Sequence, residues 1–171
     1  MTARIRLSGD ASPPQLAAAD LAVGEIVAQR ELHLDAQMFA QFAALTGDAH
    51  PIHYDDDYAK RQGHAAPVAH GLLLVAISAL GATALSAQLH DAMVAMLSVE
   101  ASFQRPVHLN DTVRCTYRVD HIEAKRNNRS TVGITVNIET VDGHNGTLSL
   151  PRCVVRLQFL LKTNLEESPH A

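Results

Sequence analysis

The stretch Val68-Ala-His-Gly-Leu-Leu-Leu-Val-Ala-Ile-Ser-Ala-Leu-Gly81 decides the fold of this chain. It is apolar on nearly every helical face, and a helix of that kind is buried in a protein core. The sequence therefore predicts one long central helix over about 69–89, beginning at His70-Gly71. A glycine inside a helix costs roughly 1 kcal/mol against alanine. We expect close packing of a sheet against Gly81 to offset that cost.

Downstream of this helix the apolar residues recur with a period of two, which indicates β-strands. Four strands are expected, over 93–103, 112–119, 131–141 and 148–161. A basic turn at 125–129 and a Gly-bounded turn at 142–146 separate the later ones, and Pro151 predicts a bulge or an edge position. One buried helix followed by antiparallel strands is an α+β arrangement. We expect the hot-dog fold, an antiparallel sheet wrapped around a long central helix, and its open edges favour dimerisation.

The chain upstream of the central helix supplies shorter elements. A modest strand is expected over 26–33, an amphipathic helix from its cap Asp35 to Thr46-Gly47, and a short helix from about 55 to 62. The predicted division of the chain is a flexible N-terminal arm (1–20), a single hot-dog domain (21–162) and a flexible C-terminal tail (163–171).

Composition narrows the classes of function. The chain has 171 residues, a formal net charge of -4 and only 4% aromatic residues, so we expect no nucleic-acid partner. Polar residues interrupt the apolar run 65–89, which favours a helix buried in protein and predicts no membrane span. Cys115 and Cys153 have no metal or redox spacing and lie in apolar strands. Buried free thiols fit a reducing compartment, so we expect the cytoplasm.

Ahead of the central helix lies the segment Phe42-Ala-Ala-Leu-Thr-Gly-Asp-Ala-His-Pro-Ile-His53. Its turn residues place the Asp48 carboxylate and the His53 imidazole on one short loop. A helix starting at Gly71 adds a free backbone N–H, and an acid/base pair beside such a donor is typical of a catalytic site. Singly, Asp48 is more often a loop cap and His53 a partly buried ring.

The same residue types could bind a metal ion. That interpretation would use His50, His53 and His64 together with Asp48, and we rank it below the acid/base pair. We therefore expect no metal site.

The segments Thr46-Gly-Asp-Ala-His-Pro-Ile-His53 and Pro67-Val-Ala-His-Gly-Leu-Leu72, followed by the run 101–113, carry a family resemblance. Over about residues 22–161 the chain resembles the MaoC-like dehydratases, and within them the (R)-specific enoyl-CoA hydratases. The resemblance implies reversible addition of water to a trans-2-enoyl thioester of coenzyme A or of an acyl-carrier protein. It also implies a homodimer or higher homo-oligomer, and no cofactor besides the coenzyme A of the substrate.

The resemblance also implies roles for individual residues. Asp48 and His53 would activate the water, and the Gly71 N–H would polarise the thioester carbonyl. His50, Ser78 and His70 are expected to contact the substrate, and the His70 ring also to brace the loop. His50 stands where the family usually has Asn, and Ala79 where it has a small polar residue.

Two other functions stay open from the sequence. A hot-dog acyl-CoA thioesterase would need a carboxylate on the central helix, and neither Asp nor Glu occurs between His70 and His90. A non-catalytic acyl-binding module would have no use for the pair of Asp48 and His53.

Overall fold

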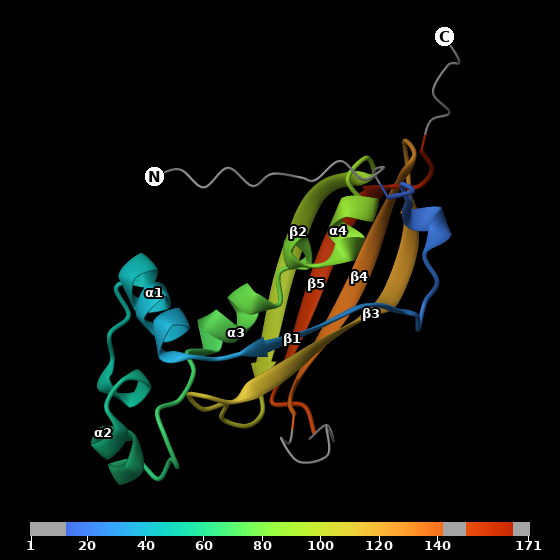
Figure 1. Cartoon of the computed structure of the whole chain (residues 1–171). Helices are drawn as coiled ribbons and strands as arrows, with labels where there is room; N and C mark the ends of the chain where they lie inside the picture. Colours follow the sequence, from blue (N-terminus) through green and yellow to red (C-terminus); the bar gives the residue numbers. More distant parts are fainter. Residues whose placement is uncertain (1–12, 142–149, 166–171) are drawn as a thin grey trace.

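The computed structural model describes residues 13–141 and 150–165. A five-stranded sheet is its main element, with the strand order β1-β3-β4-β5-β2 and antiparallel pairing throughout. Its strands are β1 (Ile26–His33), β2 (Met93–Phe103), β3 (Thr112–Lys125), β4 (Arg129–Thr140) and β5 (Cys153–Lys162). The sheet curves around the helices that follow residue 70 (Figure 1). The expected α+β hot-dog arrangement is therefore confirmed.

The core lies between these helices and the concave face of the sheet. On β3 the alternation of side chains buries Val113, Cys115, Tyr117 and Val119 completely. Ile138 on β4 pairs with Cys115 on one side and with Cys153 on the other. Both cysteines are buried free thiols, as expected, and burial raises the pKa of each to about 11. The thiols therefore stay protonated and behave as small apolar groups.

The prediction of one continuous central helix is wrong. The segment divides into α3 (Gly71–Ile77), the 3₁₀ turn η3 (Leu80–Ala82) and α4 (Ala84–Gln88). The Ser78 hydroxyl donates to the Val75 carbonyl at 2.7 Å, and the Thr83 hydroxyl donates to the Leu80 carbonyl at 2.7 Å. Such local bonds offer the backbone an alternative to helix continuation.

The break also changes the interpretation of this segment's apolar residues. Gly81 lies in η3, so the cost of a glycine inside an α-helix does not arise there. Leu72 is 68% exposed, so α3 is not buried all round.

Helices α1 (Ala36–Thr46) and α2 (Asp56–Arg61) lie beyond one end of the sheet (Figure 1). The predicted cap is confirmed, because the Asp35 carboxylate accepts from the Met38 N–H at 2.8 Å. Gly47 ends α1 in the left-handed region, at φ 77°, which glycine adopts without strain. A 3₁₀ turn, η2 (Pro51–His53), connects this end to α2, where Asp55 forms the cap.

Other sequence expectations are met in part. Residues 13–20 belong to the segment predicted as an arm, yet they pack on the domain. Within them, Ala17 and Ala18 are buried, Ala18 at the start of the turn η1 (Ala18–Asp20), and the Leu16 N–H donates to the Gln88 carbonyl at 2.7 Å. The last strand begins at Cys153, so Pro151 lies ahead of it. The turn predicted at 142–146 lies outside the described residues. Across the described ranges, no helix has the length and hydropathy needed to cross a membrane.

Candidate active site

The loop that carries Asp48 is held by the end of α1. The Thr46 hydroxyl donates to the Phe42 carbonyl at 2.7 Å and accepts from the Asp48 N–H at 3.2 Å. The Asp48 carboxylate accepts from the His50 N–H at 3.4 Å and remains exposed. The left-handed Gly47 and the Thr46 side chain together therefore fix the backbone position from which the Asp48 side chain extends.

His50 braces this loop from within. Its Nδ1 accepts from the Ile52 N–H at 3.3 Å and so caps η2, and its ring meets Tyr58 edge-on with centroids 5.5 Å apart. The capping contact is one that an asparagine side chain also makes. The contacts of His50 within the chain therefore stabilise the loop, and a contact between its ring and a substrate stays a prediction.

His53 is fixed by the strand-like segment that leads into α3. Its Nδ1 lies 2.6 Å from the Val68 carbonyl oxygen, and the Val68 N–H donates to the Ile52 carbonyl at 3.0 Å. A carbonyl oxygen only accepts, so Nδ1 must carry the proton of this bond. Nε2, on the other side of the ring, is then the nitrogen that can exchange a proton with a substrate.

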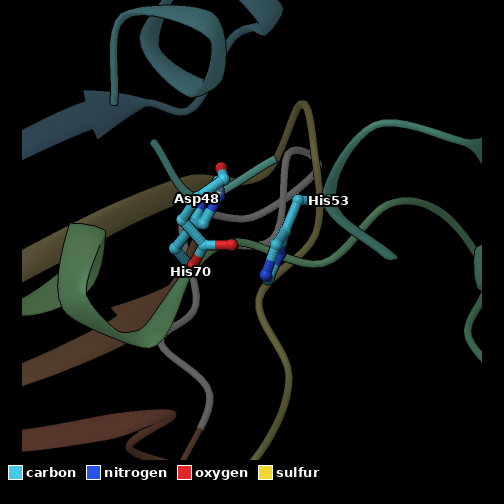
Figure 2. Close-up of side chains that lie close together, drawn as sticks. All are labelled: Asp48, His53 and His70. Carbon is cyan, nitrogen blue, oxygen red and sulfur yellow. Dashed lines mark hydrogen bonds between the residues drawn. The ribbon is translucent and has the colours of Figure 1, made fainter. Parts of the chain in front are cut away.

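His70 lies close to both Asp48 and His53 (Figure 2). The residue is 2% exposed, and its ring stacks on the His53 ring with centroids 3.7 Å apart and planes 24° apart. Ligand atoms of Asp48, His53 and His70 all lie within 4.8 Å of one another. Burial, and next the neighbouring His53, lower the pKa of His70 below its usual 6.5.

The three side chains are metal ligands by type, but the stacked rings oppose a shared ion. A nitrogen lone pair lies in the plane of its ring, and two nearly parallel planes do not converge on one ion at the roughly 2.0–2.1 Å that zinc requires. His64, the further ligand considered from the sequence, lies near His108 instead, with ring centroids 6.1 Å apart. The geometry favours an acid/base pair over a metal site.

A cavity of about 420 Å³ opens beside Gly71. Its walls are mostly apolar, with polar groups at His64, Gln104 and Arg105, and the remaining lining residues are Val68, Ala69, Gly71, Leu74, Phe103, Pro106 and Val107. The Phe103 ring lies so close to Gly71 that an added Cβ would stand 2.9 Å from it. Asp48 and His53 are not among the lining residues, and Val68 connects the cavity to the pair.

Ser78 is the one predicted substrate contact that lies apart from the others. It is fully buried at the end of α3, where its hydroxyl donates to the Val75 carbonyl. Its role in this chain is to end α3, and a role in substrate binding stays a prediction.

Sequence reasoning missed Tyr54 and Phe103. The Tyr54 hydroxyl lies 2.9 Å from His70 Nε2, 3.1 Å from the Phe39 carbonyl and 3.2 Å from the Asp48 carbonyl. Burial, and next the Asp48 carboxylate, raise its pKa, so it remains a hydroxyl. The position of Tyr54 directly after His53 was the available signal. Phe103 gave none, because its contact with Gly71 depends on how β2 pairs.

The sheet wrapped around helices and the Asp/His pair define a hot-dog domain with a candidate acid/base site. A family model described as "MaoC like domain" matches residues 19–142. The chain belongs to this family of MaoC-like domains. No match was found among curated protein sequences.

Solved structures agree on the fold. The monoamine oxidase regulatory protein from Archaeoglobus fulgius superposes with a TM-score of 0.76 at 20% identity, covering 90% of this chain and 99% of its own. The (R)-hydratase from A. caviae involved in PHA biosynthesis gives 0.61 at 26% identity, covering 85% and 98%. The HadBC complex of Mycobacterium tuberculosis, a 3R-hydroxyacyl-ACP dehydratase, gives 0.63 at 16% identity, covering 83% and 98%.

Proposed function

We propose that this protein is an (R)-specific enoyl-CoA hydratase, which adds water reversibly to a trans-2-enoyl thioester. The observation that carries the proposal is the pairing of the Asp48 carboxylate with a His53 ring whose Nδ1 is bonded to Val68. Membership of the MaoC-like family and the likeness to an (R)-hydratase at 26% identity support it.

The chemistry requires two proton transfers on one face of the alkene. The pair of Asp48 and His53 takes one proton from water, and the oxygen of that water bonds to Cβ. The electrons of the C=C bond move towards the thioester, giving an enolate-like oxygen, and Cα then receives one proton from the pair. The net addition is H and OH, and general acid–base assistance of this kind contributes roughly 10²–10⁴-fold.

Gly71 is the proposed donor to the thioester oxygen. It lines the cavity and begins α3, so its N–H is not used inside the helix. A preorganised donor at a developing oxyanion is worth roughly 10²–10³-fold. The mostly apolar walls around Leu74 and Val107 suit the acyl chain, with coenzyme A or an acyl-carrier protein as its carrier. The reaction uses no cofactor beyond that carrier.

The edge strand β2 supports a homodimer. Among the described residues it pairs with β5 alone, and it exposes Val94, Met96, Leu97, Val99 and Phe103. An unpaired apolar edge is a template for a second strand, and Phe103 would place that second copy beside the cavity. By light scattering, the wild type should have the mass of a dimer and a Val99→Lys variant that of a monomer. The same mass for both proteins would contradict the proposed interface.

The cytoplasmic location expected from the two thiols stays a prediction.

The test of activity uses crotonyl-CoA, with absorbance of the enoyl band and release of free thiol followed together. Loss of the band without free thiol is the expected result. Release of free thiol would instead support the thioesterase. If neither occurs with enoyl-CoA esters of graded length or with the matching carrier-protein thioesters, the hydratase proposal is wrong, and an acyl-binding module is the better description.

A further inference from the structure

We infer that Tyr54 and His70 form a positioning pair, with His70 held as a neutral imidazole that carries its proton on Nε2. In its link to turnover the inference rests on the proposed function, because the groups being positioned are Asp48 and His53. The assignment of the His70 proton depends on the structure alone.

Counting donors and acceptors gives the tautomer. His70 Nε2 has two oxygen neighbours, the Tyr54 hydroxyl at 2.9 Å and the Asp48 carbonyl at 3.3 Å. His70 Nδ1 is buried and has no hydrogen-bond partner among the described residues. A proton on Nδ1 would leave a buried donor unpaired, which costs about 1–3 kcal/mol. A proton on Nε2 has an acceptor, and the unpartnered Nδ1 is then only a lone pair.

The Tyr54 hydroxyl completes the same count. It has one proton to give, and two backbone carbonyls, of Phe39 and Asp48, lie within 3.2 Å. If His70 donates through Nε2, Tyr54 is free to donate to one of these carbonyls. If Nε2 were an acceptor, it would compete for the single proton of Tyr54. The Nε2-protonated form therefore satisfies more of the polar groups in this cluster.

The pair contacts each segment that sets the site. Tyr54 joins the Phe39 carbonyl of α1 to the Asp48 carbonyl of the loop. The His70 ring contacts both the Phe42 ring, with centroids 4.7 Å apart, and the His53 ring, with centroids 3.7 Å apart. The backbone position of Asp48 and the orientation of the His53 ring thus both depend on Tyr54 and His70.

His70 cannot itself take part in proton transfer without losing this arrangement, because protonation would add the unpaired Nδ1–H. Burial, and next the neighbouring His53, lower the pKa of His70, which favours the neutral ring at neutral pH. It is therefore a positioning residue, and its side chain makes no hydrogen bond that caps α3, so replacing it does not remove a helix cap.

The first test compares two tyrosines. A Tyr54→Phe variant removes the hydroxyl that meets three groups, whereas Tyr58→Phe, in the first turn of α2, removes a hydroxyl with no hydrogen-bond partner among the described residues. A misplacement of about 1 Å costs roughly 10²-fold in rate. We expect kcat of Tyr54→Phe to fall by roughly 10-fold to 10²-fold, with KM little changed, and Tyr58→Phe to match the wild type. Equal kcat in the two variants would overturn the positioning role.

The second test separates the two nitrogens of His70. Glutamine places its amide N–H where Nε2 lies, and asparagine places it nearer Nδ1. His70→Gln should keep more of kcat than His70→Asn, and the reverse order would overturn the assignment. Should both variants fail to fold, Tyr54→Phe and the following measurement still decide.

The third test does not depend on turnover. Nitrogen-15 NMR of histidine-labelled wild-type protein reports which ring nitrogen carries the proton. The expected result for His70 is protonation at Nε2 alone at neutral pH, and a change of the His53 signals in Tyr54→Phe. A proton on Nδ1, or a charged ring at neutral pH, would overturn the inference even if the protein hydrates enoyl thioesters. The expected pattern in a protein that turns over no thioester would support the pairing and refute only the proposed function.

Discussion

The central strand β4 and the loop 46–54 are stabilised by different kinds of interaction. The β4 side chains Val132, Ile134, Val136 and Ile138 are at most 1% exposed. None of the residues 46–54 is buried. The loop takes its shape from hydrogen bonds of Thr46, His50, His53 and Tyr54 with nearby backbone groups.

The difference separates stability from geometry. Burial of apolar area is non-directional, so it stabilises the fold without fixing any single atom closely. A hydrogen bond contributes only about 0.5–1.5 kcal/mol net, but it restricts distance and angle. We expect substitutions in β4 to change the free energy of unfolding, and substitutions in the loop to change turnover in a protein that remains folded.

The largest effect is expected at the paired side chains of the loop. Asp48→Asn and His53→Gln each remove one proton-transfer group and keep the size of the side chain. Turnover of the enoyl thioester should fall by roughly 10²–10⁴-fold, whereas the melting temperature should change little because neither residue is buried. The matched control is Asp57→Asn in the first turn of α2. Near-normal turnover in either loop variant would refute the proposed pair.

The opposite pattern is expected in the sheet. Ile138→Ala empties a fully buried site between Cys115 and Cys153, and should cost about 2–5 kcal/mol of unfolding free energy in a denaturant titration. Ile26→Ala makes the same change at a position on β1 that is 46% exposed, where about 0.5 kcal/mol or less is expected. Per folded molecule, kcat should be unchanged in both. A loss of kcat in Ile138→Ala would contradict the proposal that the sheet determines stability and the loop determines turnover.

The sheet was also the part that sequence predicted best. Alternating apolar residues follow from one buried and one less buried face, so 112–119 and 131–141 were recognisable as strands. The turn and cap residues Gly47, Asp35 and Asp55 ended and began the helices where expected, since their effects are local.

Sequence failed where the outcome depended on competition or on contacts distant in the chain. The continuous helix over 69–89 was wrong because the hydroxyls of Ser78 and Thr83 bond to the backbone, and hydropathy does not register that competition. The motif brought Asp48, His53 and Gly71 to attention, but the contacts of Tyr54 with Phe39 and His70 join three segments. Such contacts have no period in the sequence.

An intermediate effect is expected at Gly71, where loop and sheet meet. In Gly71→Ala the new Cβ would stand 2.9 Å from the far end of the Phe103 ring, which is 53% exposed in the single chain and is expected to shift. The melting temperature should therefore hardly change. The displaced ring should narrow the cavity and raise KM by roughly 10-fold, which corresponds to about 1.4 kcal/mol.

Two variants check the cause of that effect. Gly81→Ala is the matched control, because nothing lies within 4 Å of its added Cβ. A second substitution, Phe103→Leu, should restore KM of Gly71→Ala if the displaced ring is responsible. If KM stays raised in the double variant, the methyl group itself obstructs the thioester and Phe103 has no part in the effect.

The smallest effect concerns pH and the buried ring of His70, which packs against the loop. The pKa of His70 is lowered from 6.5 by burial and by His53, so the unfolded chain binds a proton there more readily than the folded protein. The contribution of the neutral ring to stability is thus fully present above about pH 6.5, and it is lost as the pH falls towards the folded pKa. Melting temperatures of wild type and His70→Gln should differ most above pH 7 and converge towards pH 5. A difference that widens on acidification would mean that the folded protein holds His70 charged, and the neutral positioning ring would have to be abandoned.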